Sequence, residues 1–276
     1  MKRIDAHQHF WRLADRAGSW PPAELEAIYR DFLPQDLEPQ LAAHGMAGTV
    51  LVQSLPSVAD TRFLLQLAKA SPFVLGVVGW VDLKATDAAS QIAALANDAT
   101  LKGLRPMLQD LADVRWIDDP ALEPAIAAML RCDLAFDALV LPRHLPALLA
   151  FAQRYPALRI VIDHAAKPPI ASGEHAAWAA DLRRLAALPQ VHCKLSGMLT
   201  EAGPGWTLAD LQPYASVVLE AFGAQRVIWG SDWPVVNLVS DYAGWIAASA
   251  HLLDGLSEQE MAQVLGLNAI RFYRLD

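Results

Sequence analysis

Cysteine is scarce in this chain. Only Cys132 and Cys193 occur in 276 residues, and both lie in apolar segments. Two isolated cysteines cannot form the framework of a disulfide-stapled secreted fold. We therefore expect two buried free thiols in a reducing compartment, where each behaves as a small hydrophobic side chain.

Positive charge and long apolar runs are also in short supply. Lys and Arg number 22 against 30 Asp and Glu, which gives a net charge of −8 without any basic cluster. This balance argues against nucleic acid and anionic membranes as partners. No apolar run is long enough to span a bilayer, and no charged-then-apolar leader precedes the first predicted strand. We therefore expect a cytoplasmic protein.

Hydrophobic residues are abundant, at 54% of the chain, and they follow a regular alternation. Short runs rich in Val, Ile, Leu or Phe predict strands at 3–7, 48–53, 73–80, 101–105, 133–137, 159–163, 191–195 and 226–230. Ala- and Leu-rich stretches predict helices at 34–44, 58–70, 87–98, 121–131, 144–154, 175–187, 207–222, 241–253 and 258–272. Eight strand–helix units without a Ser/Gly linker favour an α/β fold, a (β/α)8 TIM barrel forming a single domain over 1–276.

The segment 10–33 interrupts this alternation. It carries several aromatic residues, including Trp11, Trp20 and Phe32, together with prolines and arginines. It is too long for a bare turn, so we expect a long loop after strand one. Two interpretations stay open: a surface excursion packed on its own aromatics, or a lid or pocket wall over the barrel mouth.

The first predicted strand runs straight into two histidines, His7 and His9. Residues two apart on a strand point to the same side. Both imidazoles therefore aim at one spot, where they can bind a metal, donate a hydrogen bond or carry a proton. The alternative is a pair of partly buried histidines at a strand end, although two such polar rings are costly to bury without partners.

Most other strands of the predicted barrel also end in polar side chains. The carboxyl ends of barrel strands meet in one pocket, so these groups are expected to share it. They are Gln53, Arg105 with nearby Gln109, Asp137, Asp163-His164 with nearby Lys167, Lys194 and Ser196, and Ser231-Asp232.

Some of these positions have plainer explanations. Asp163 should point away from His164 on a regular strand, so we expect it to be structural. Arg105 is either a site residue or part of a rim salt bridge, and Lys167 is either a site residue or a solvated loop lysine. Lys194 lies in an apolar strand, which favours a site role. Trp11 and Trp233, which follow site motifs, predict an apolar wall for a compact organic substrate.

Several of these motifs together resemble those of the amidohydrolase superfamily, and in particular its sugar lactonase branch, which includes L-fuconolactonases and L-rhamnonolactonases. The motifs are Asp5-Ala6-His7-Gln8-His9-Phe10-Trp11, Gly103-Leu104-Arg105, Asp163-His164 with Lys167-Pro168, Lys194-Leu195-Ser196-Gly197 and Trp229-Gly230-Ser231-Asp232-Trp233-Pro234. They span nearly the whole chain.

The wider superfamily holds one or two divalent metals at such a site, often with a carboxylated lysine or a glutamate on strand four. This chain departs from that pattern, since Arg105 stands on strand four and Lys194 adds a second cation. Fixed positive charges oppose binding of a divalent ion at short range. We therefore expect catalysis without a required cofactor. A zinc ion, if present, would be held by His7, His9, His164 and Asp232.

The resemblance implies hydrolysis of a sugar-acid lactone, a small-molecule partner, to the free acid. In this hypothesis Asp232 activates water, while His7, His9 and His164 polarise the carbonyl together with Arg105 or Lys194. The residues predicted to bind substrate are Trp11, Gln53, Gln109, Lys167 and Trp233. Two alternatives remain: a metal-dependent hydrolase or decarboxylase of a small carboxylic acid or dicarboxylic lactone, and a non-catalytic sugar-binding barrel.

Overall fold

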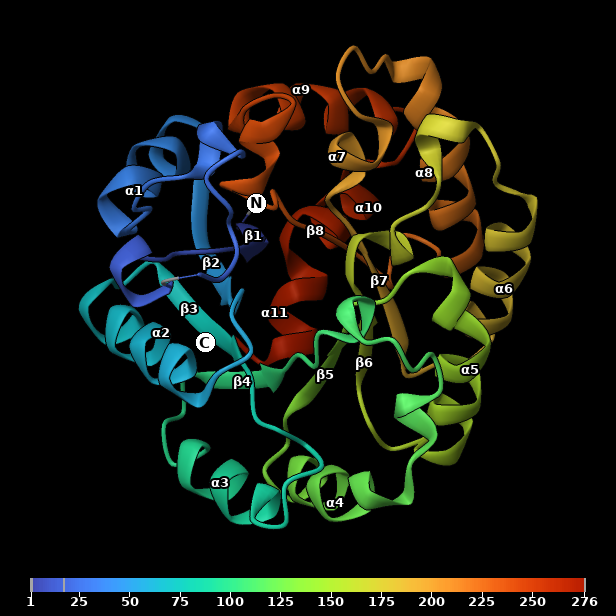
Figure 1. Cartoon of the computed structure of the whole chain (residues 1–276). Helices are drawn as coiled ribbons and strands as arrows, with labels where there is room; N and C mark the ends of the chain where they lie inside the picture. The colour runs from blue at the N-terminus through green and yellow to red at the C-terminus, as the bar shows by residue number, and fades with distance from the viewer. Residues whose placement is uncertain (1, 17, 276) are drawn as a thin grey trace.

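The computed structural model describes residues 2–16 and 18–275 and contains one eight-stranded sheet. Each strand pairs in parallel with the next one along the chain, in the order β1 to β8. The strands are β1 (Arg3–Gln8), β2 (Met46–Val52), β3 (Val74–Gly79), β4 (Leu101–Leu104), β5 (Ala135–Ala138), β6 (Ile160–Ile162), β7 (Val191–Leu195) and β8 (Val227–Trp229). The predicted TIM-barrel class is confirmed (Figure 1).

The barrel closes between β8 and β1 at the rim where both strands end. Gln8 and Trp233 form an isolated parallel bridge. The His9 amide donates to the Trp233 carbonyl at 2.8 Å, and the Asp232 amide donates to the His7 carbonyl at 2.8 Å. The first and the last strand-end motifs of the chain are therefore joined backbone to backbone.

Helices surround the strands on the outside (Figure 1). They are α1 (Pro34–Ala43), α2 (Val58–Ala70), α3 (Ala88–Leu95), α4 (Glu123–Arg131), α5 (Leu145–Arg154), α6 (Ala176–Ala186), α7 (Met198–Ala202), α8 (Leu208–Phe222) and α9 (Tyr242–Leu252). Apolar side chains of these helices and of the outward-facing strand positions form the larger hydrophobic core. None of the helices in the described residues has the length and apolar character needed to cross a membrane.

The C-terminus closes the barrel at the end where the strands begin. After α10 (Glu258–Ala262) and a π-helical turn (Gln263–Leu267), α11 (Asn268–Tyr273) appears at the centre of the ring in Figure 1, and its Phe272 carbonyl accepts from Arg159, which directly precedes β6. Its Phe272 and Tyr273 pack with inward-facing residues such as Ile4, Val50 and Ile228 in a second, smaller core. The helix predicted over 258–272 is present without a break, with a π-helical turn in its middle, and its last part is a plug rather than an outer helix.

Segment 9–33, between β1 and α1, contains two short 3-10 turns, Leu13–Arg16 and Glu26–Ile28. Trp11 and Phe32 form an isolated antiparallel bridge. Buried Arg16 donates to Ser54 and Asp60 on the barrel side and to the Trp20 carbonyl within the segment. These contacts fix Trp20 against the barrel rim.

Candidate active site

A cavity of about 390 Å³ opens at the carboxyl ends of the strands. Its base contains His9, Arg105, His164 and Asp232. Around them it has apolar side chains, namely Trp20, Met107, Leu139, Val235 and Leu238, and polar ones, namely Ser54, Gln109, Asp110, Lys167, Thr200 and Glu201. The volume and this mixture suit a small organic molecule that carries several polar groups.

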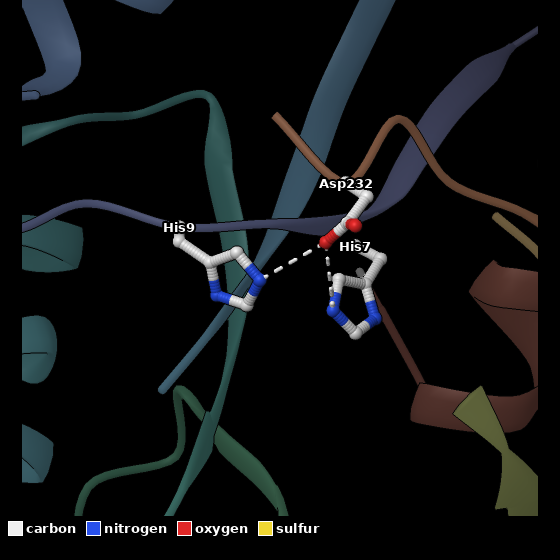
Figure 2. Close-up of side chains that lie close together, drawn as sticks. All are labelled: His7, His9 and Asp232. Carbon is white, nitrogen blue, oxygen red and sulfur yellow. Dashed lines mark hydrogen bonds and ion pairs between the residues drawn. The ribbon is translucent and has the colours of Figure 1, made fainter. Parts of the chain in front are cut away.

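Asp232 lies between the two histidines that end β1 (Figure 2). Its Oδ1 atom is 3.3 Å from His9 Nε2 and 3.7 Å from His7 Nε2. His9 Nδ1 lies 2.7 Å from the Val52 carbonyl oxygen, which can only accept, so the proton of neutral His9 is on Nδ1. His9 Nε2 therefore presents a lone pair toward the carboxylate.

His164 joins this group from the end of β6. Its Nε2 is 3.8 Å from Asp232 Oδ1, and its ring centroid is 4.4 Å from that of His7. Its Nδ1 is 2.9 Å from the Ser196 hydroxyl. His164 has a left-handed backbone, with φ +52°, so the chain leaves the strand geometry at this residue.

Asp163 does not point away from the site, so the expectation from strand alternation is wrong. Its Oδ1 is 2.9 Å from Lys194 Nζ and 3.5 Å from His7 Nδ1, while its Oδ2 accepts from Arg105 at 3.2 Å. The reason is the left-handed turn at His164, which sends two successive side chains into the barrel. Asp163 is thus part of a buried ionic cluster beneath the cavity.

Lys194 is the centre of that cluster and lies outside the cavity lining. It is fully buried, and its Nζ is 2.7 Å from Asp137 Oδ2 and 3.1 Å from His7 Nδ1. The Tyr273 hydroxyl of the C-terminal plug donates to the same Asp137 oxygen at 2.5 Å. The structure therefore places Lys194 one layer below the position predicted for it, behind His7 rather than facing substrate.

The other predicted site residues divide into two groups. Arg105, Gln109 and Lys167 line the cavity. Trp11, Gln53 and Trp233 do not, since all three are buried elsewhere. The Trp11 indole donates to the Arg30 carbonyl, and its ring packs against Trp20 and Phe32. The Gln53 amide donates to the Arg105 carbonyl. Trp233 packs on Phe10 and Phe32.

Several cavity residues were not predicted from the sequence. Glu201 lies in α7 and forms a 3.5 Å ion pair with Lys167 across the cavity wall. Its position a few residues after the Lys194–Gly197 motif was the available signal, but a single acidic residue in a loop is too common to stand out. Trp20 lies in an irregular segment and Asp110 in a short 3-10 turn (Leu108–Asp110), and sequence periodicity predicts no side-chain direction in either.

The electrostatics of the site favour a carboxylate next to neutral imidazoles at neutral pH. Burial lowers the pKa of His164 to about 4, against the opposing effect of Asp232. Burial also lowers the pKa of His7, and the neighbouring Lys194 ammonium adds to that shift. Burial acts to raise the pKa of Asp232, but the three nearby imidazoles outweigh it and hold that pKa below its usual range.

The donor set at the base of the cavity partly fits a divalent metal ion. Ligand atoms of His7, His9 and Asp232 lie within 4.8 Å of one another, a set of two nitrogens and one oxygen that suits zinc with an open position. The two lone pairs of His9 Nε2 and Asp232 Oδ1, 3.3 Å apart, favour a cation between them. The Arg105 guanidinium, 3.3 Å from His7 Nε2, opposes it.

The chain is similar over nearly its whole length to proteins of known activity. The chain is 62% identical to L-fucono-1,5-lactonase of Burkholderia ambifaria, with 99% of this chain and 96% of the relative covered. It is 39% identical to L-fucono-1,5-lactonase of Burkholderia multivorans, with 99% and 96% covered. A crystal structure of an amidohydrolase from Burkholderia multivorans with bound zinc superposes with a TM-score of 0.93 at 39% identity, covering 100% of both chains.

The profile of the amidohydrolase family matches residues 4–275, nearly the whole chain. This match covers both the histidine pair that ends β1 and the aspartate that follows β8. The predicted resemblance is confirmed, and the chain belongs to the amidohydrolase family.

Proposed function

We propose that this protein is a lactonase that hydrolyses L-fucono-1,5-lactone or a closely similar sugar-acid lactone to the free acid. The observation that carries the proposal is the Asp232 carboxylate, which lies between imidazoles at the base of a small mixed polar and apolar cavity. Two relatives named L-fucono-1,5-lactonase, 62% and 39% identical over almost the full chain, support the same substrate class.

The nucleophile is a water molecule held by Asp232 and His9. Both His9 Nε2 and Asp232 Oδ1 are acceptors that converge at the cavity base. One water can donate a proton to each of them and direct its own lone pair at the lactone carbonyl carbon. Asp232 takes a proton as this water attacks, which is the role of a general base.

The negative charge that develops on the carbonyl oxygen needs hydrogen-bond donors. Arg105 and His164 line the cavity and can donate to this oxygen, and His7 lies directly behind His164, with ring centroids 4.4 Å apart. When the tetrahedral intermediate collapses, the C–O bond of the ring breaks. Asp232 then returns its proton to the ring oxygen, which leaves as a hydroxyl group. Because His9 acts as an acceptor here, its predicted part in polarising the carbonyl is replaced by a part in holding water.

Side chains of the cavity wall can bind the rest of the substrate. Gln109, Lys167 and Glu201 can exchange hydrogen bonds with the hydroxyl groups of a sugar acid. The apolar side chains of Trp20 and Leu139 can pack against its C–H faces.

A bound zinc ion would be held by His7, His9 and Asp232 and would supply polarisation of the carbonyl oxygen. The fixed Arg105 charge can serve the same purpose, so we expect activity to persist after chelation, with the metal content of the sample counted. A rate that is lost with the metal and returns in proportion to added zinc would overturn this expectation.

The substrate assignment is tested with a panel of aldonolactones and a pH indicator, since each turnover releases an acid. We expect L-fucono-1,5-lactone to be hydrolysed well above the spontaneous rate. A decarboxylase would release carbon dioxide from an acid and leave lactones intact. A sugar-binding barrel would bind a lactone in a calorimeter without consuming it, and either result would refute the proposal.

A further inference from the structure

Lys194 has three polar neighbours around its amine: it is within hydrogen-bond geometry of Asp137 and His7, and it forms an ion pair with Asp163. They are Asp137 Oδ2 at 2.7 Å, Asp163 Oδ1 at 2.9 Å and His7 Nδ1 at 3.1 Å. An ammonium can donate but cannot accept a hydrogen bond. The contact with His7 Nδ1 is therefore a hydrogen bond only when this ring nitrogen accepts.

His7 has a second cation on its other ring nitrogen. Arg105 Nη1 lies 3.3 Å from His7 Nε2, and a guanidinium is also only a donor. An imidazole between two cations is neutral, and a neutral imidazole has one nitrogen that accepts and one that carries a proton. The two cations therefore compete for a single lone pair, and only one of the two contacts is a hydrogen bond.

Burial decides this competition in favour of Lys194. Its side chain is fully buried and lies outside the cavity lining, so a proton directed at His7 Nδ1 has no cavity water to meet instead. Arg105 lines the cavity, where a spare N–H can meet water or substrate, and its other contacts with Asp163 and the Gln53 carbonyl are kept. A buried donor without a partner costs more than one at a wet surface.

We propose that Lys194 is a positioning residue that holds His7 in the tautomer with its proton on Nε2. That N–H faces Asp232 Oδ1, which is 3.7 Å away and therefore beyond hydrogen-bond distance, so the proton remains free for another acceptor. His7 thereby becomes a hydrogen-bond donor at the site, and its Nε2 lone pair is withdrawn from metal binding. The use of this donor on a lactone oxygen rests on the proposed function, whereas the tautomer does not.

The surrounding contacts explain why a buried lysine is held so firmly. Asp137 and Asp163 balance the charges of Lys194 and Arg105, and Tyr273 anchors Asp137 from the C-terminal plug. Without Lys194, the Nδ1 atom of His7 could instead donate to Asp163 Oδ1, now 3.5 Å away. A carboxylate behind Nδ1 is the usual outer partner of a histidine that binds metal through Nε2.

The tautomer can be measured directly on the wild-type protein. Histidine labelled with ¹⁵N gives two-dimensional NMR patterns that separate the Nδ1–H form from the Nε2–H form, and loss of one pattern in a His7→Gln variant assigns His7. We expect the Nε2–H pattern. The Nδ1–H pattern would overturn the proposal, and neither result depends on whether the protein hydrolyses lactones.

The role of Lys194 is tested with a charge-balanced pair of variants. Lys194→Met combined with Asp137→Asn removes one buried charge of each sign, and Asp137→Asn alone is the matched control. We expect His7 to move to the Nδ1–H form and zinc to bind at least about tenfold more tightly, by calorimetry, in the double variant only. An unchanged tautomer and zinc affinity would show that Lys194 does not set the form of His7. If the double variant does not fold, the wild-type spectrum still decides.

Discussion

At the scale of single residues, Asp232 is the side chain on which the proposed reaction depends most directly. Its carboxylate is within 3.8 Å of the three imidazoles, and it is the acidic residue at the base of the cavity among the described residues. We expect Asp232→Asn to lower kcat on a sugar lactone by at least about a hundredfold, because an amide cannot take a proton from water. Steady-state rates from the pH-indicator assay measure this effect.

The control for that substitution is Asp254→Asn, which makes the same chemical change at an exposed position in the turn after α9. Its kcat should equal that of the wild type. Retention of full activity by Asp232→Asn, at unchanged Tm, would remove this residue from the role of base.

Residue-level prediction worked where the backbone stays regular. His7 and His9 were placed at one spot from strand alternation, and the structure brings both to Asp232. Asp163 was misjudged because His164 takes a left-handed conformation, which alternation cannot anticipate. Lys194 was recognised as unusual in an apolar strand, but its depth below the cavity depends on long-range packing against Asp137 and Tyr273.

At the scale of elements, the turn between β7 and α7 shapes the site through Gly197. This glycine has φ +65°, and a Cβ atom built on it would lie 2.6 Å from His164 Nδ1. We expect Gly197→Ala to lower kcat by at least about tenfold, since the added methyl group displaces the His164 ring, which lies beside Asp232. A displacement near 1 Å can lower the rate by about a hundredfold. The readouts are kcat and the Tm of the same preparation.

Gly173→Ala separates displacement of His164 from backbone strain. Gly173 has φ +73°, close to that of Gly197, but a Cβ atom there would meet no other atom within 4 Å. Both variants should lose about 1 kcal/mol or more of stability, because alanine is strained in this conformation. Equal kcat values in the two variants would contradict a specific contact between Gly197 and His164.

Element-level prediction depended on periodicity and on length. All eight strands and the helices from α1 to α6, α8 and α9 were found near their predicted positions, because buried parallel strands and amphipathic helices leave clear patterns. Helix α7 was missed because a five-residue helix in a loop has too few positions to show a period. The position of α11 over the end of the barrel was missed because an apolar helix end looks the same whether it packs on the outer face or closes the barrel.

At the scale of the whole molecule, the barrel interior is arranged in layers. The C-terminal plug with Phe272 and Tyr273 lies at one end, and an apolar layer follows. The buried ionic cluster around Lys194 comes next, and the imidazoles with Asp232 lie at the cavity. Charges buried this deep are tolerated because each has a partner of opposite sign. The ionic cluster below the site therefore stays balanced only while the fold holds these partners together.

The same burial makes the whole molecule sensitive to acid. His192 on β7 packs against Phe272, with ring centroids 4.7 Å apart, and burial lowers its pKa to about 4; the pKa of His164 is also lowered to about 4. Because the unfolded chain takes up these protons near pH 6.5, stability is fully present above that pH and is lost as pH falls toward 4. Buried Asp5, whose pKa burial raises to about 6, acts in the opposite direction, since its proton favours the folded state.

We therefore expect Tm to fall by at least about 5 °C between pH 6.5 and 4.5 in calorimetric scans. His192→Gln should lessen this fall, because it removes one buried imidazole and leaves His164 and Asp5 in place. His251→Gln, at an exposed position in α9, should follow the wild-type curve. The difference between the wild type and His192→Gln in the change of Tm with pH separates the contribution of His192 from that of every other titrating group. Parallel curves for the wild type and His192→Gln would show that burial at the plug end of the barrel does not contribute to acid lability.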